Sequence, residues 1–160
     1  MKILLLIISV LIAAQSAYSY DSLKIAYENA IDAYENDKFE EAIVQFNKYL
    51  SVASAHDEAF HLRGNAYYKL KNYEKAMEDY VRAYELGYID AEMFYRMARY
   101  YKENSNNEAA FTFFQKTVDT DSENTEAYIE LGRLSIQKED YEGATRYFRA
   151  ALALDPKVPD

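Results

Sequence analysis

The sequence predicts an all-α protein, a solenoid of four helix-turn-helix repeats. The main observation is a spacing of 34 residues that places alanines at Ala42, Ala76, Ala110 and Ala144. An aromatic residue follows each alanine by four positions, and a very small residue precedes each by twelve: Phe46, Tyr80, Phe114, Phe148; Ala30, Gly64, Ala98, Gly132. A period of this length is typical of stacked helical hairpins, in which each unit packs only on its neighbours.

Clusters of polar and turn-forming residues divide the chain into eight predicted helices. We expect them at 23–36, 39–52, 57–70, 73–86, 91–103, 107–119, 125–137 and 141–154, paired into repeats at 23–56, 57–90, 91–124 and 125–156. Helix starts are expected at Ser22, at Asp57 and within Asp121 to Asn124, whose side-chain oxygens suit free backbone N–H groups. Asp155-Pro156 should end the last helix, because proline cannot continue it.

Small and aromatic residues have complementary packing roles in this pattern. Small residues near Gly64 and Ala76 should let the two helices of a repeat approach closely. The aromatic residues, 17 Tyr and 8 Phe with no Trp, should then fill the gaps between units. We therefore expect most aromatic side chains in the core.

The repeats match a known pattern most closely at two places. Repeat four combines Tyr128, Leu131-Gly132, Tyr141, Ala144, Phe148 and Pro156, and residues 59–76 of repeat two follow the same order. This arrangement resembles the tetratricopeptide repeat over residues 23 to about 156. Repeats one and three depart from it at Ala26, Asn29 and Asn107, so we expect looser packing there. The resemblance implies a right-handed superhelix whose first helices line a concave groove for protein or peptide partners.

Residues 1–19 do not fit the repeat pattern. Lys2 precedes an apolar run from Ile3 to Ala14, and small or polar residues follow. This is the pattern of a secretory signal peptide, and its apolar stretch is shorter than the roughly 20 residues that span a bilayer. We predict a signal peptide at 1–19, cleaved after Ser19 or alternatively Ser16, and a repeat domain at 20–160. A retained membrane anchor is the less favoured alternative.

Composition narrows the compartment and the partners. The mature chain is expected in a bacterial periplasm or outside the cell, without stable membrane insertion. The formal net charge is −9, and removal of residues 1–19 with their single lysine leaves −10. Because an acidic chain binds polyanions poorly, we expect no nucleic acid partner. The chain has no cysteine, so its short helices must be stabilised by stacking.

We expect no enzymatic activity, metal or cofactor. His56 and His61 are the only histidines, and their spacing does not suit a metal site. There is no cysteine nucleophile, and the four glycines form no phosphate-binding loop.

The first helix of each repeat presents one set of residues at equivalent positions. The predicted groove residues are Tyr27, Tyr34, His61, Asn65, Tyr68, Tyr95, Arg99, Lys102 and Arg133. The groove should be aromatic in its N-terminal half and basic in its C-terminal half. We hypothesise that it holds an extended peptide, with Arg99 and Arg133 pairing a carboxylate and Asn65 contacting the peptide backbone.

The hypothesis is similar to the carboxylate clamp of co-chaperone tetratricopeptide domains. Tyr27 and Tyr95 stand where that clamp has lysines, so its ligand specificity does not transfer. In the alternative interpretation, the arginines only neutralise Glu92, Glu103 and Glu126.

A second hypothesis concerns the C-terminal end. Lys157 to Asp160 follow the last repeat, so we expect no capping helix over the side formed by Tyr147, Phe148, Ala151 and Leu152. An uncovered apolar strip of this kind usually marks an interface or an aggregation risk. The chain would then form a homo-oligomer or dock onto a larger complex.

Overall fold

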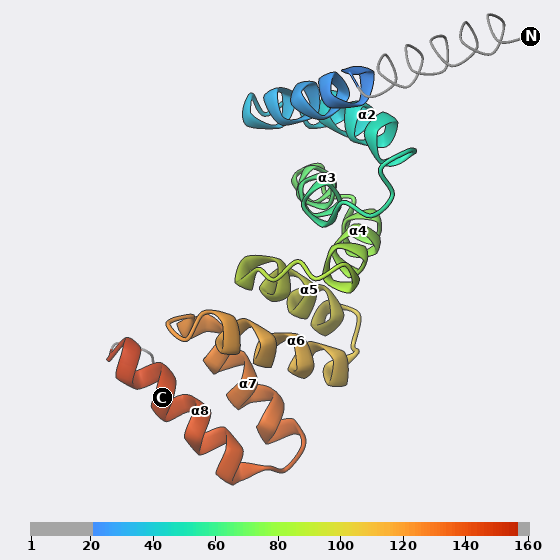
Figure 1. The fold of residues 1–160 in the computed structure, drawn as a ribbon. Helices are drawn as coiled ribbons and strands as arrows, with labels where there is room; N and C mark the ends of the chain where they lie inside the picture. Colours follow the sequence, from blue (N-terminus) through green and yellow to red (C-terminus); the bar gives the residue numbers. More distant parts are fainter. Residues whose placement is uncertain (1–20, 157–160) are drawn as a thin grey trace, which may run out of the picture. The chain divides into compact units, whose positions relative to one another are not determined.

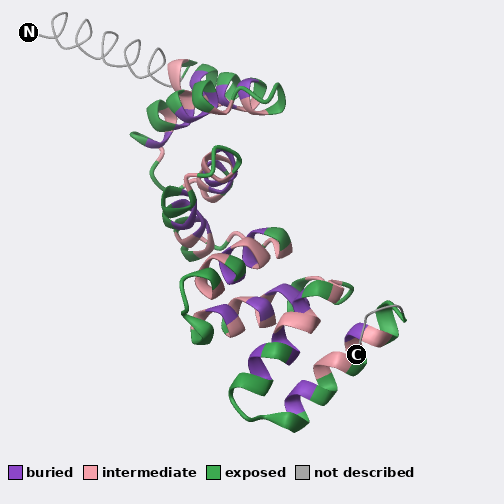
Figure 2. Ribbon diagram, turned by 180° about the vertical axis from the view of Figure 1, so that it is seen from behind, coloured by how far each residue is buried: buried purple, intermediate pink, exposed green. Residues whose placement is uncertain are grey.

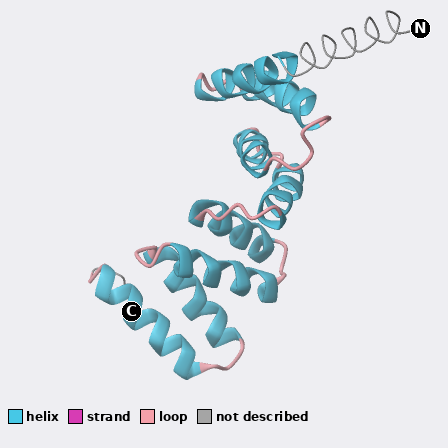
Figure 3. Cartoon of the chain, viewed as in Figure 1, coloured by secondary structure: helices cyan, strands magenta, loops and turns pink. Residues whose placement is uncertain are grey.

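The computed structural model describes residues 21–156, which form helices joined by loops, with no strand in that range (Figures 1 and 3). Residues 21–35 are helical. The labelled helices are α2 Phe39–Leu50, α3 Asp57–Lys69, α4 Tyr73–Glu85, α5 Ala91–Glu103, α6 Asn107–Thr120, α7 Thr125–Gln137 and α8 Tyr141–Leu154. The predicted all-α architecture of four paired repeats is confirmed. The predicted signal peptide and its cleavage sites lie outside the described residues.

The described residues divide into two compact units, unit 1 ending at Tyr88 and unit 2 beginning at Ile89. Unit 1 contains repeats one and two, and unit 2 contains repeats three and four. The two helices of a repeat pack on each other, as in the pairs α3 with α4, α5 with α6 and α7 with α8. Neighbouring repeats meet through α2 with α3 in unit 1 and through α6 with α7 in unit 2.

All four repeats turn in the same way between their two helices. The residues Asp37, Lys71, Ser105 and Glu139, spaced 34 apart, all have φ between 58° and 61°. The next residue donates its backbone N–H to the carbonyl five positions earlier, as Asn72 does to Tyr67 at 2.9 Å. This bond closes the end of the first helix. None of the four is glycine, so each turn holds a side chain in a costly left-handed conformation.

Side chains cap the starts of five helices. Asn72, Asp90, Asn106, Asn124 and Asp140 each accept a hydrogen bond from the backbone N–H three residues later. The predicted starts at Asp57 and Asn124 are confirmed, since Asp57 is the first residue of α3 and Asn124 caps α7. Ser22 differs, because it lies inside the first helix. At the caps of α2 and α3, Lys38 and His56 make no side-chain capping bond.

Glycine allows the closest helix contacts inside repeats two and four. A Cβ atom added at Gly64 would lie 2.7 Å from the Tyr80 ring, and one added at Gly132 would lie 2.7 Å from the Phe148 ring. The repeated alanines Ala42, Ala76, Ala110 and Ala144 are all buried. Buried and exposed residues alternate along the helices in Figure 2, as expected for helices with one packed face.

Candidate functional site

The predicted groove residues lie on the first helices of the repeats. Those of unit 1 come from residues 21–35 and α3, and those of unit 2 come from α5 and α7. Each unit therefore presents a separate candidate surface.

In unit 1, Tyr27 belongs to a cluster of three aromatic rings. Its ring centroid lies 4.9 Å from that of Tyr49 and 5.0 Å from that of His56. The Tyr27 hydroxyl donates to Glu58 Oε2 at 2.9 Å. Burial, followed by this hydrogen bond, raises the pKa of the Tyr27 hydroxyl above its usual value. Tyr27 thus links the first helix to Tyr49 of α2 and to Glu58 of α3.

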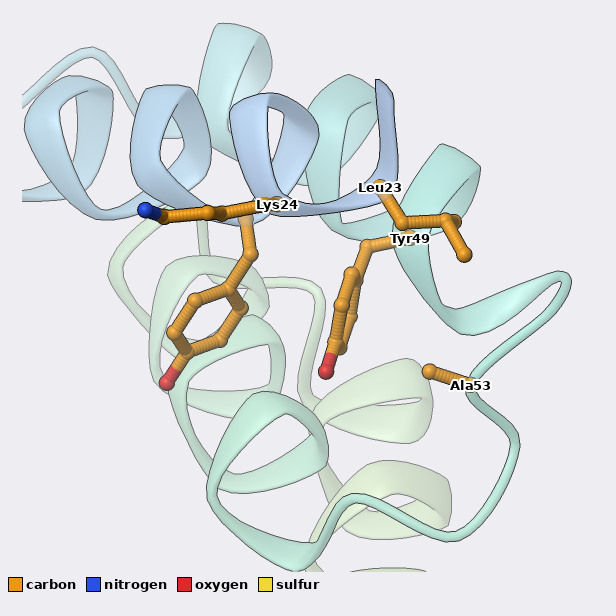
Figure 4. Close-up of a pocket in the computed structure, with 5 residues that line it drawn as sticks. Leu23, Lys24, Tyr49 and Ala53 are labelled. Atoms are coloured by element: carbon orange, nitrogen blue, oxygen red, sulfur yellow. The ribbon is translucent and has the colours of Figure 1, made fainter. Parts of the chain in front are cut away.

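A cavity of about 310 Å³ opens beside this cluster. It is lined by Leu23, Lys24, Tyr27, Tyr49 and Ala53. Figure 4 shows the Tyr49 ring and the Leu23 side chain, which come from different helices, close to the loop that carries Ala53. Lys24 extends along its own helix and forms a 3.7 Å ion pair with Glu28. The cavity is mainly apolar, and its volume suits one large side chain of a ligand.

The polar residues predicted for α3 point into the protein. Asn65 is only 7% exposed, and its Oδ1 accepts a 2.7 Å hydrogen bond from the Tyr80 hydroxyl. Its Nδ2 lies 3.1 Å from His61 Nε2. The His61 ring also stacks on Tyr88, with centroids 4.3 Å apart. Asn65 therefore serves an internal network, which leaves little of its amide for a ligand.

Tyr34 and Tyr68 occupy equivalent positions near the ends of their helices. Tyr34 packs edge-on against Phe39 at 5.7 Å, and Tyr68 packs in the same way against Tyr73 at 5.2 Å. Both contacts join the two helices of one repeat. Their rings are half-buried, so they contribute to the hairpin as well as to its surface.

In unit 2, the structure brings two of the predicted basic residues together around one carboxylate. Lys102 Nζ lies 2.9 Å from Glu130 Oε2, and Arg133 Nη1 lies 3.0 Å from Glu130 Oε1. Arg99 forms a longer 3.4 Å pair with Glu103. We call Arg99, Lys102 and Arg133 the basic cluster. Its three cations pair with two carboxylates, those of Glu103 and Glu130.

The pairing agrees only in part with the simple neutralisation of Arg99 and Arg133 by nearby acids. Arg99 pairs with Glu103 as that interpretation expects, but Glu92 pairs with Arg96. The partner of Arg133 is Glu130 rather than Glu126. The Arg133 side chain remains 64% exposed, so it can still meet a ligand.

Tyr95 borders this region on α5. It is half-buried and packs edge-on against Phe114, with ring centroids 5.7 Å apart. Burial raises the pKa of its hydroxyl, and the nearby Arg99 charge opposes the rise. Tyr95 therefore offers a neutral, partly exposed ring.

The predicted C-terminal interface is mixed in its exposure. Ala151 is fully buried, and the Tyr147 hydroxyl donates to Gln115 Oε1 of α6 at 2.8 Å. Phe148 and Leu152 are half-buried. Tyr147 thus joins repeat four to repeat three, while Phe148 and Leu152 retain some accessible surface.

Two features of the structure were not predicted. Arg63 forms a bidentate pair with Asp79, at 2.8 Å and 2.6 Å, and also donates to Asn47 Oδ1 of repeat one. Burial raises the pKa of the Asp79 carboxyl, and Arg63 opposes that rise. The other feature is the ion pair between Glu130 and Arg133. It was predictable, because residues three apart on a helix are neighbours on its surface.

Two further searches were limited to residues 21–156. No group of three or more His, Asp or Glu side chains in this range lies close enough to bind a metal ion. None of the helices there is long and apolar enough to cross a membrane.

Comparison with protein families identifies the repeat type. Residues 58–86 and residues 125–158 each match a model of the tetratricopeptide repeat. The chain contains tetratricopeptide repeats. The matched segments are repeats two and four, the two that follow the pattern most closely in sequence. The two matched repeats are therefore the second repeat of unit 1 and the second repeat of unit 2.

The tetratricopeptide chain is also similar to a longer curated protein. It is 24% identical over 151 residues to DnaJ homolog subfamily C member 3 of Gallus gallus. The match covers 87% of this chain but 30% of that protein, so the chain spans about a third of the relative's length.

Solved structures share the fold of this tetratricopeptide protein. A crystal structure of MamA has a TM-score of 0.69 at 20% identity, covering 84% of this chain and 79% of that one. YrrB, described as a TPR protein with an unusual peptide-binding site, has a TM-score of 0.72 at 21% identity, covering 82% and 68%. MamA 41-end from Desulfovibrio magneticus RS-1 has a TM-score of 0.66 at 22% identity, covering 86% and 78%. At these identities the similarity concerns the fold.

Proposed function

We propose that this protein is a non-enzymatic interaction module that binds a carboxylate-bearing peptide segment of a partner protein. The observation that supports this most directly is the position of Glu130 between Lys102 and Arg133. Two cations from two different helices already hold a carboxylate at 2.9 Å and 3.0 Å. The faces of α5 and α7 are therefore built with the spacing that recognition of a carboxylate requires.

Two other observations support peptide binding. The apolar cavity beside Tyr27 and Tyr49 has room for a large side chain, so unit 1 offers a second type of contact. YrrB, which shares the fold, has a peptide-binding site according to its description.

A pull-down with an Arg99→Ala, Arg133→Ala variant tests the proposal. We expect it to lose the partner that the unchanged chain retains from an envelope extract. The matched control is Arg146→Ala, Arg149→Ala, which removes two exposed arginines of α8 and thus the same charge. Equal retention by all three proteins would contradict the proposal.

The alternative is a structural subunit that assembles through α8. It is supported by the accessible surface of Phe148 and Leu152 and by Leu154, which is 41% exposed. A Leu152→Glu, Leu154→Glu variant, which leaves the Phe148 contact with Gly132 in place, should then lower the oligomeric state in light scattering while leaving partner capture unchanged. A chain that is monomeric before the change would exclude this alternative.

Export is a further part of the proposal. It rests on Lys2 and the apolar run from Ile3 to Ala14, which have the order of a signal peptide. The measurement is the mass of the protein recovered from bacterial periplasm. A chain starting at Tyr20 or at Ala17 would support export, whereas full-length chain confined to the cytoplasm would contradict it.

A further inference from the structure

Glu130 has an unusual position for an acid on a candidate binding face. Each of its carboxylate oxygens lies within 3.0 Å of a different cation, one from α5 and one from α7. Its side chain is only 15% exposed, whereas those of Arg99 and Arg133 are 48% and 64% exposed. Glu130 is thus less exposed than the cations of the basic cluster, and its carboxylate lies where a ligand carboxylate would bind.

We infer that Glu130 is an intramolecular competitor for the carboxylate subsite and restricts the ligand to segments with two or more carboxylates. This inference rests on the proposed function. A tethered group has an effective concentration on the order of millimolar, so a ligand must displace it rather than fill an empty site. A ligand carboxylate that takes the place of Glu130 exchanges one set of ion pairs for another, so its gain is at most about 1 kcal/mol, which corresponds to roughly fivefold in affinity. A single carboxylate therefore gains little by replacing Glu130.

A second carboxylate has a place to bind beside the first. Arg99 lies three residues before Lys102 on α5, on the same side of the helix. Its pair with Glu103 is long, at 3.4 Å, and both side chains are about half exposed. A segment with clustered acids would replace Glu130 with one carboxylate and reach Arg99 with another. The two contacts together offset the cost of displacement.

Two fluorescent peptides test the inference, tetraglutamate and a tetrapeptide amide with one glutamate among glycines. The unchanged protein should bind tetraglutamate at least about tenfold more tightly than the single-glutamate peptide. Glu130→Gln should bind the single-glutamate peptide about five- to tenfold more tightly than the unchanged protein does. Glu130→Asp, which keeps the charge but shortens the side chain, should give an intermediate gain.

The matched control is Glu126→Gln, because it removes the same charge from an exposed position one turn earlier on α7. It should change either affinity by less than about twofold. An equal gain from Glu126→Gln would overturn the inference, since net charge alone would then explain the effect.

The two levels of the proposal fail in different ways. If Glu130→Gln weakens both peptides while the unchanged protein binds tetraglutamate, Glu130 positions the two cations and the competitor inference is wrong. The proposed function then still stands, provided that Arg99→Ala, Arg133→Ala abolishes tetraglutamate binding. If neither the unchanged protein nor Glu130→Gln binds tetraglutamate, both the inference and the carboxylate-binding function are wrong.

Discussion

Repeats two and four have the same backbone design but different interiors. Both place a glycine against an aromatic ring, Gly64 on Tyr80 and Gly132 on Phe148. Around this contact, repeat two has Arg63, Asn65, Asp79 and Tyr80, whereas repeat four has Leu131, Arg133, Tyr147 and Phe148 at the equivalent positions. Repeat two thus encloses a polar network, and repeat four has a more apolar interior with its cation outside.

The difference shows how the second helix of a repeat decides what the first helix offers to a ligand. Asn65 faces the Tyr80 hydroxyl, donates toward His61 and stays buried. The equivalent Arg133 has a phenylalanine opposite it and extends to the surface. A repeat can therefore use the residue after its glycine for stability or for recognition, according to the ring it packs against.

The largest expected effect comes from Arg63→Leu, which introduces the repeat-four residue into repeat two. Asp79 has a 6% exposed side chain and would lose its bidentate partner, so we expect a loss of about 3 kcal/mol in the free energy of unfolding. Urea denaturation measures it. A loss below about 1 kcal/mol would show that the pair is not a main support of repeat two.

A second substitution and the pH sharpen this test. Adding Asp79→Tyr completes the repeat-four pair and should restore most of the loss. Because burial already raises the pKa of Asp79, the folded state of the single variant favours the protonated acid. The stability that this variant loses relative to the unchanged protein should be small near pH 4, which is close to the pKa of an aspartate in the unfolded chain. The loss should grow as the pH rises to about 7.

The next effect compares the two glycines. Gly64→Ala should cost about 2 kcal/mol, because the buried Tyr80 ring is held by its hydrogen bond to Asn65 and cannot move aside. Gly132→Ala should cost less, since Phe148 lacks a hydroxyl and is only half-buried. Thermal unfolding of the two variants provides the measurement. Equal shifts in Tm would mean that the hydrogen bond does not fix the ring.

Tyr80→Phe makes the aromatic ring of repeat two identical to that of repeat four. It leaves Asn65 Oδ1 without this donor in a buried site, and we expect a cost of about 1–2 kcal/mol. A double-mutant cycle with Asn65→Leu should give a coupling energy of about 1 kcal/mol from urea denaturation. If the effects of the two substitutions simply add, the Tyr80 hydroxyl is not the reason that Asn65 points inward.

The smallest effect concerns a feature that the two repeats share. Lys71 and Glu139 both have φ of 61° at the turn, so glycine should relieve a similar strain in each. Lys71→Gly and Glu139→Gly are each expected to stabilise the protein by up to about 1 kcal/mol, partly offset by greater freedom of the unfolded chain. A clear difference in their Tm shifts would show that the turns also differ in their surroundings.

The helices and the small-residue contacts were predictable from sequence because they follow from spacing. The predicted bounds of 91–103, 125–137 and 141–154 agree with α5, α7 and α8. Turn residues and proline act on the backbone next to them, so their effect on helix bounds can be predicted from a single sequence. The pairing of Gly64 with Tyr80 follows equally from the repeat register.

The positions of polar side chains were less predictable, because they depend on partners distant in sequence. His61 and Asn65 share the register of exposed groove residues, yet a hydroxyl 15 residues after Asn65 holds them inside. A sequence signal does exist, since Tyr80 stands where the other repeats have Phe46, Phe114 and Phe148. The ion pair of Arg63 and Asp79 has a similar signal, because both residues replace apolar ones of repeat four.

The helix caps also have a kinetic consequence. Helices α4 to α8 follow a side chain that accepts from the backbone N–H three residues later, whereas Lys38 and His56, which precede α2 and α3, make no such bond. In the first turn of α3 only the Glu58 N–H is bonded to a side chain, Asp57 Oδ1, at 2.9 Å. The other amide protons in the first turns of α2 and α3 should therefore exchange with solvent fastest among the helix starts of residues 39–154. His56 is also part of the aromatic cluster beside the cavity. Brief opening at the start of α3 would therefore expose that cluster to solvent.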